Sequence, residues 1–175
     1  FVFIAIAGYI SYRGLDSTQK LQYVLVAIQI AAIVLFDVVA IHNAYTHGGF
    51  DFTPISLEWF NPAGIGSFSL VAAGISLSIF MFWGWDVTLT MNEETKNPEK
   101  TPGRAATITV LIIIALYILT ALAVISWAGT GDTGLGAGNP DNQESIFAAL
   151  SEPVLGKASI LIYIAVLSSS CLLYT

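Results

Sequence analysis

A glycine and a carboxylate interrupt a long apolar segment in the middle of the chain. In the segment 67–91, Gly84 lies two residues before Asp86, and aromatic residues surround both. Glycine weakens a helix by about 1 kcal/mol relative to alanine. A carboxylate inside a membrane is costly unless it faces protein or water. Together these residues predict a membrane helix that is broken near Gly84, beside a polar cavity.

A broken helix in lipid has backbone groups that need partners from the protein or from a ligand. The carbonyl groups at Phe80–Trp83 would end the outer half of the helix and form a partial negative pole, which suits an ammonium group. The alternative is that Gly84 only allows close packing. The neighbouring Asp86 favours the functional interpretation, because acids inside membranes are rare outside functional sites.

The residues around and after this glycine resemble a known family. They are Gly84-Trp85-Asp86, Glu93-Glu94-Thr95-Lys96-Asn97-Pro98, Pro102 and Arg104. This pattern resembles the amino acid–polyamine–organocation transporter family, where it covers the sixth helix and the loop to the seventh. Two weaker similarities, to the family's fifth and eighth helices, are Tyr12-Arg13-Gly14 with Gln22-Tyr23, and Ala165-Val166-Leu167-Ser168-Ser169. The resemblance therefore covers nearly the whole chain, as helices four to eight of a longer protein.

The resemblance implies a partial leucine-transporter-type inverted-repeat fold, with substrate between broken helices one and six. It implies that the backbone at Phe80, Met81, Trp83 and Gly84 faces the substrate's amino group. It also places Phe80 where relatives carry an aromatic ring over the substrate. The alternative is that Phe80, Phe82 and Trp83 are ordinary core aromatics. The first helix is expected to lie outside this sequence, so half of the site would be missing.

Polar residues at membrane depth are the candidates for gating or ion coupling. Gln29 lies about 12 Å along its helix from Leu21, where some proton-coupled relatives carry a lysine; the alternative is a hydrogen bond between helices. Ser168 and Ser169 lie in a helix that helps bind sodium in sodium-coupled relatives, or else they hydrogen-bond to the preceding turn. Asp86 is either a proton-sensitive gate residue or a buried partner of a neighbouring helix.

Other chemical groups are sparse. Asp37 lies near the end of its apolar segment, so its carboxylate is expected to reach water. His42 and His47 have no acid or cysteine pattern around them, and no metal site is expected. Cys171 is the one cysteine, so no internal disulfide is possible. No cofactor is expected, and coupling to protons or sodium stays open.

Composition and hydropathy indicate the elements that must position these residues. The chain is 55% hydrophobic and 10% charged, whereas a soluble domain has about 25% charged residues. Five apolar segments favour an all-α polytopic transmembrane helix bundle in one membrane domain. Both end segments are expected to be parts of longer helices, cut from a longer protein. The expected helices are about 1–12 (truncated), 21–41, 67–91 (broken near Gly84), 105–128 and 158–175 (truncated).

Basic residues predict which loops face the cytoplasm, because cytoplasmic loops are rich in Lys and Arg. Loops 13–20 and 92–104 together contain Arg13, Lys20, Lys96, Lys100 and Arg104. Loops 42–66 and 129–157 contain only Lys157. The first pair is therefore predicted to be cytoplasmic and the second pair extracellular. Residues 143–150 could form one or two helical turns that end before Pro153.

The patterns predict an integral membrane protein, and the family resemblance implies a permease, a secondary active transporter that moves an amino acid or a related amine such as a polyamine by alternating access. Its expected partners are this substrate, the lipid bilayer and the missing helices of the same protein. Nucleic acid is not expected, because the chain has no basic stripe. An enzyme is not expected either, since no His-Glu-x-x-His, Gly-x-Ser-x-Gly or cysteine cluster occurs. The alternative is a channel or structural membrane subunit without a substrate site.

Overall fold

The computed structural model describes residues 15–81, 97, 99–143 and 145–172. Helices and their connections make up these residues, which contain no strand. The all-α class predicted from the sequence is confirmed for this part of the chain. The elements in order are α2 (Leu15–His47), η1 (Leu57–Phe60), η2 (Pro62–Ile65), α3 (Phe68–Met81), α5 (Thr101–Ala128), α6 (Pro140–Gln143), α7 (Ile146–Leu155), η4 (Gly156–Ser159) and α8 (Ile160–Leu172).

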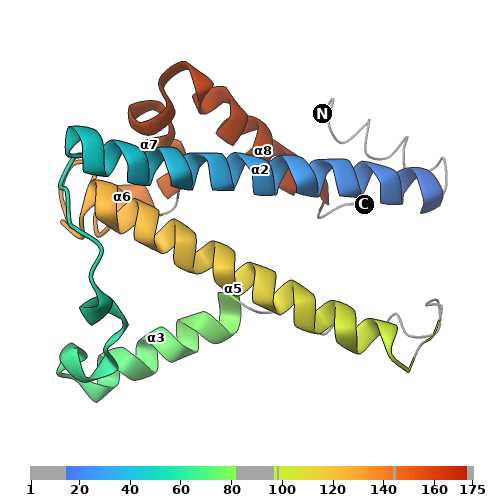
Figure 1. Ribbon diagram of the computed structural model, residues 1–175, viewed down its shortest axis with the longest axis horizontal. Helices are drawn as coiled ribbons and strands as arrows, with labels where there is room; N and C mark the ends of the chain where they lie inside the picture. Colours follow the sequence, from blue (N-terminus) through green and yellow to red (C-terminus); the bar gives the residue numbers. More distant parts are fainter. Residues whose placement is uncertain (1–14, 82–96, 98, 144, 173–175) are drawn as a thin grey trace. The chain divides into compact units, whose positions relative to one another are not determined.

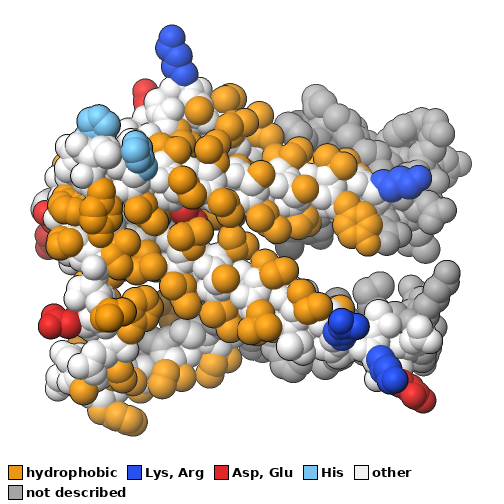
Figure 2. Space-filling view, in the orientation of Figure 1, with side chains coloured by type: hydrophobic (Ala, Val, Ile, Leu, Met, Phe, Trp, Pro, Cys, Tyr) orange, Lys and Arg blue, Asp and Glu red, His pale blue; other side chains and the backbone are white. Residues whose placement is uncertain are grey.

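Three helical stretches of the described residues are long and apolar enough to cross a membrane, namely Lys20–His47, Thr101–Ala128 and Ile146–Ser169. A shorter apolar helix covers Phe68–Ile79. Figure 2 shows hydrophobic side chains over the visible faces of the helices, with most of the Lys and Arg side chains near helix ends. This pattern fits helices whose middle parts contact lipid or other apolar helices.

Helix α2 is longer than the apolar segment that predicted it. It has 33 residues and is about 50 Å long at the helical rise, whereas the apolar core of a bilayer is about 30 Å thick. Polar residues continue the helix at both ends of the expected range 21–41. The helix ends at Gly48, whose φ of +91° suits glycine. The Gly48 amide donates a 3.1 Å hydrogen bond to the carbonyl of Ala44.

The chain forms two compact units, Phe1–Pro54 with Thr120–Thr175, and Ile55–Leu119. In the first unit, α2 lies against α7 and α8, and α8 runs antiparallel to α2 (Figure 1). The buried cluster of this unit is made of small and large apolar side chains: Ala32, Phe36, Ala40, Ala44, Ala123, Val124, Trp127, Ala128, Leu150, Val154, Ile162 and Ala165.

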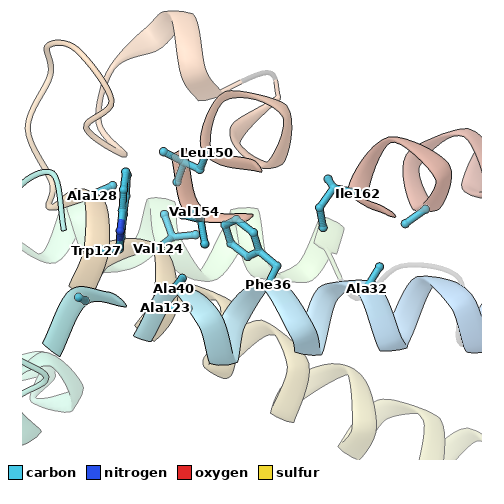
Figure 3. Packing of buried hydrophobic residues seen from close by; sticks show 12 residues of the cluster. Ala32, Phe36, Ala40, Ala123, Val124, Trp127, Ala128, Leu150, Val154 and Ile162 are labelled. Carbon is cyan, nitrogen blue, oxygen red and sulfur yellow. The ribbon is translucent and has the colours of Figure 1, made fainter. Parts of the chain in front are cut away.

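Phe36 is the largest fully buried side chain of the cluster. Its ring projects from α2 toward Val154 (Figure 3), and it meets the ring of Phe147 edge to face, with centroids 5.4 Å apart and planes at 74°. Edge-to-face pairs are favoured by the quadrupoles of the rings. Phe36 therefore joins α2 to α7 at the centre of the first unit.

Helix α7 differs from the prediction for this region, which was a loop with a few helical turns ending before Pro153. The helix includes Pro153 and runs to Leu155. Leu150 and Val154 are buried on its inner face, and Phe147 packs beside them. Proline in the last turn of a helix removes only one hydrogen bond, so this packing outweighs its effect. Asn43 of α2 also donates a 3.1 Å hydrogen bond to the carbonyl of Val154.

The chain after α2 is tied to the last turn of α5. The amides of Phe50 and Asp51 both donate to the carbonyl of Trp127, at 2.8 and 3.2 Å, and the amide of Thr53 donates to the carbonyl of Ser126 at 3.1 Å. Gly49 lies so close that an added Cβ would be 2.5 Å from the same Trp127 oxygen. We call this segment, residues 48–54, the strap.

The second unit contains η1, η2, α3 and the first part of α5. Asn61 links the two short helices, because its side chain accepts a 3.1 Å hydrogen bond from the amide of Ala63 at the start of η2. In α3 the large apolar residues are mostly exposed, including Leu70, Ile75, Leu77 and Ile79. Helix α5 begins at Thr101, four residues before the expected start, with Pro102 in the first turn, where proline is well tolerated.

Candidate polar site between helices α2 and α8

Two of the candidate residues, 139 positions apart in sequence, meet in the first unit. The Gln29 side-chain amide donates a 3.0 Å hydrogen bond to the Ser168 hydroxyl oxygen. Ser168 is buried, with 5% of its surface exposed, and Gln29 is half-buried. The Ser168 hydroxyl in turn donates to the carbonyl of Ala165 at 2.7 Å. Gln29 thus makes the hydrogen bond between helices that was one of its two predicted roles.

Small residues let the two helices approach at this point. Ala32 and Ala165 lie one turn from Gln29 and Ser168, and both are buried. Close approach at small residues is common in membrane helix pairs, where it improves packing and shortens polar contacts. An amide side chain carries no charge at any ordinary pH. The pair is therefore a fixed polar contact, and Gln29 itself cannot carry a proton as a lysine would.

Ser169 does not join this contact. Its side chain is exposed, and its hydroxyl donates to the carbonyl of Val166 in its own helix, at 2.7 Å. Both serines therefore satisfy the alternative prediction of hydrogen bonds to the preceding turn. Only Ser168 also accepts a bond from a second helix. The described residues contain no group of three or more His, Cys, Asp or Glu side chains that could hold a metal ion.

The predicted substrate site lies mostly outside the described residues. Phe80 and Met81 are the last two residues of α3. Trp83, Gly84 and Asp86 lie outside the described ranges, so the break near Gly84 remains a prediction.

The burial of Asp37 differs from the expectation from the sequence. The carboxylate was expected to reach water, but the side chain is fully buried. The Thr120 hydroxyl donates a 2.9 Å hydrogen bond to its Oδ2 atom, while Oδ1 has no hydrogen-bond partner among the described residues. Sequence position alone could not show this, because its hydrogen-bond partner Thr120 lies 83 residues away, on α5. The one available signal was a charged residue inside an apolar segment.

Comparison with known proteins shows which family the chain resembles. The family model described as amino acid permease matches residues 1–173. A branched-chain amino acid permease, BcaP, of Lactococcus lactis subsp. cremoris (strain MG1363) is 29% identical over 181 residues, covering 98% of this chain and 37% of that protein. The protein of the same name from Bacillus subtilis (strain 168) is 28% identical over 118 residues, covering 67% of this chain and 23% of that protein. No solved structure gives a significant match.

Proposed function

We propose, since the chain belongs to the amino acid permease family, that the protein is a secondary active transporter that moves an amino acid across the membrane by alternating access. The match over nearly the whole chain is the observation that carries this proposal. The apolar helices make it an integral membrane protein. The chain spans 37% and 23% of the two relatives, so transport is assigned to the full-length protein.

The proposed substrate is a branched-chain amino acid. Both relatives are named branched-chain amino acid permeases. In this chain the residue types around Gly84 are apolar and aromatic, which suits an apolar side chain. The backbone at Phe80, Met81, Trp83 and Gly84 would supply carbonyl oxygens for the ammonium group. The first helix of the full-length protein would supply the contacts to the carboxylate.

The contact between Gln29 and Ser168 is proposed to hold α2 and α8 in register during transport. Asp86 is proposed as a gate residue on the inner side of the break. Ser169 is a weaker candidate for ion coupling than Ser168, because its hydroxyl bonds only within its own helix. In the proposed orientation, loops 13–20 and 92–104 are cytoplasmic. Loops 42–66 and 129–157 are extracellular.

Transport assays on the full-length protein test this proposal. Proteoliposomes preloaded with leucine, isoleucine or valine should take up the labelled amino acid by counterflow. Absence of counterflow for all three, and for a wider panel of amino acids and amines, would contradict the proposal. Because the substrate site depends on a helix break, Gly84→Leu should abolish counterflow while the protein remains in the membrane.

Gly74→Leu is the matched control for this substitution. Gly74 lies in α3, within the same apolar segment 67–91 of the sequence, and nothing within 4 Å would meet an added Cβ. Transport by Gly74→Leu should therefore stay close to the wild-type rate. If Gly84→Leu also transports normally, the break is not part of the mechanism.

A channel or structural subunit is the alternative, and cysteine labelling separates it from a transporter. Single cysteines at positions 80–86, in a background that lacks Cys171 and other reactive thiols, should change their accessibility when substrate is added. A labelling rate that does not change when substrate is added, together with flux that does not saturate, would favour a channel.

A further inference from the structure

Asp37 lies in an apolar environment that offers it one polar partner. Its side chain has no exposed surface. Phe36 and Ala40, its neighbours on α2, are buried, and so are Ala123 and Val124, which follow Thr120 on α5. Thr120 donates to Oδ2, and Oδ1 has no partner in the described part of the chain. A buried carboxylate with a single hydrogen bond is very costly, because the lost hydration is not replaced.

No described basic side chain neutralises this carboxylate. The other titratable side chains whose burial is described on these helices are all exposed: Lys20, Tyr23, His42, Tyr45 and His47 of α2, Arg104 and Tyr117 of α5, Glu152 of α7, Lys157 of η4 and Tyr163 of α8. None of them forms a hydrogen bond to the carboxyl group, whose one partner is Thr120. Within the described part of the chain, only a ligand that binds the carboxyl group itself can remove the negative charge.

A proton fits this site better than a metal cation. Metal cations such as Ca²⁺ take several oxygen ligands, whereas the site shows one carboxyl group and one hydroxyl. The Thr120 hydroxyl hydrogen points to Oδ2, so its donor function is already used. A proton on Oδ1 removes the charge and leaves Oδ2 free to accept the bond from Thr120. The remaining cost is one O–H donor without a partner, which is smaller than the cost of a buried charge.

We propose that Asp37 and Thr120 form a proton-binding site within the membrane-spanning part of the protein. Asp37 binds a proton from water at Oδ1 when the site is open, and it carries that proton as a neutral acid in the closed arrangement described here. Opening of the contact between α2 and the second half of α5 returns the proton to water on the other side. This inference rests on the proposed transport function and gives it a coupling ion. The site differs from the contact at Gln29, which lies about 12 Å away along α2.

The first test uses Asp37→Asn in the full-length protein, reconstituted with a pH-sensitive dye inside the vesicles. Leucine, isoleucine and valine are the probes, and two activities are compared: counterflow without a gradient, and accumulation driven by a pH gradient. Asparagine has nearly the same shape as neutral aspartic acid, so counterflow should persist. Accumulation and the dye signal should fall at least about tenfold, because an amide cannot take up and release a proton.

The control is Asp132→Asn, which removes a carboxylate at an exposed position. This variant should accumulate substrate as the wild type does. If Asp37→Asn also accumulates substrate as the wild type does, the proton site is wrong and the transport function stands. If the wild type shows no counterflow with any substrate, the transport function itself fails.

A second measurement decides the case in which Asp37→Asn loses counterflow as well. Infrared spectra of the wild type at neutral pH should show the carbonyl band of a protonated carboxyl group. Thr120→Val keeps the carboxyl group and removes the hydrogen bond to Oδ2, so it should shift this band. Absence of the band in the wild type, or a band that Thr120→Val leaves unchanged, would overturn the proposal.

Discussion

The two units of the chain differ in where their side chains find partners. In the unit formed by residues 1–54 and 120–175, twelve hydrophobic residues form a buried cluster, and polar side chains such as Gln29, Asp37 and Asn43 bond to partners far away in sequence. In the described part of residues 55–119, only Pro102 and Ala106 are buried. The first unit therefore contains its own interior.

This difference shows what each unit needs from its surroundings. Apolar side chains on a lone membrane helix are satisfied by lipid, whereas polar side chains need protein partners. The first unit supplies such partners to Gln29, Asn43 and one oxygen of Asp37. Helix α3, with exposed Leu70, Ile75 and Leu77, depends on lipid or on helices outside this sequence. Matched substitutions in the two units can test this view.

The largest effect is expected at the centre of the first unit. Phe36→Ala removes a fully buried ring and its edge-to-face contact with Phe147. It should lower the free energy of unfolding by about 3 kcal/mol, mainly through the cavity that it leaves. Phe68→Ala, at a residue that is 88% exposed in the second unit, should have little effect. Reversible unfolding by SDS in bicelles measures both. An equal cost for Phe68→Ala would mean that other helices of the full-length protein cover the second unit.

A smaller effect is expected at the strap. Alanine at Gly49 would need φ of +57° and would place its Cβ 2.5 Å from the Trp127 oxygen. Gly66 of the second unit has a similar φ, +66°, but nothing within 4 Å. Gly66→Ala should cost about 1 kcal/mol from the left-handed conformation alone, and Gly49→Ala about 2 kcal/mol, because the backbone must also move. Equal costs in the same unfolding assay would show that the strap is loose in solution.

The smallest effect concerns the two candidate serines. Ser168→Ala removes the oxygen that accepts from Gln29, and should cost about 0.6 kcal/mol, the average for such bonds in membranes. Ser169→Ala removes only a bond within its own turn, and should leave stability unchanged. Thermal unfolding of the two variants, measured side by side, can resolve this difference. A larger loss for Ser169→Ala would show that its exposed face contacts another helix of the full-length protein.

Hydropathy predicted the existence of the helices but not their limits. The apolar range 21–41 marks the part of α2 that can lie in lipid, whereas the helix extends from Leu15 to His47. Hydrogen bonds within the backbone continue through polar residues, so a change in hydropathy does not end a helix. A glycine with positive φ ends it, and Gly48 was visible in the sequence. The helical turns predicted over 143–150 end too early, because α7 continues through Pro153 to Leu155, with Leu150 and Val154 buried.

The polar contacts show a second limit of sequence reasoning. The family resemblance makes Gln29 and Ser168 candidates for ion coupling, and the alternative for Gln29 is a hydrogen bond between helices. The sequence could not pair them, because the pairing depends on how α8 packs against α2. The burial of Asp37 could not be predicted for the same reason, because its partner Thr120 lies in another helix. The residues around Gly84 were the most informative in sequence, and the break they predict stays a prediction.

The long separations between partners have a consequence for biosynthesis. Helix α2 emerges from the ribosome before any of its polar partners, which follow Asp37 by 83 residues, Asn43 by 111 and Gln29 by 139. At about 5–20 residues per second, the last partner arrives on the order of 10–30 s later. During that interval the newly made helix carries an acid and two amides that have not met their partners. Its insertion must therefore rely on its many apolar residues, and the nascent protein is most vulnerable to quality control before α8 is made.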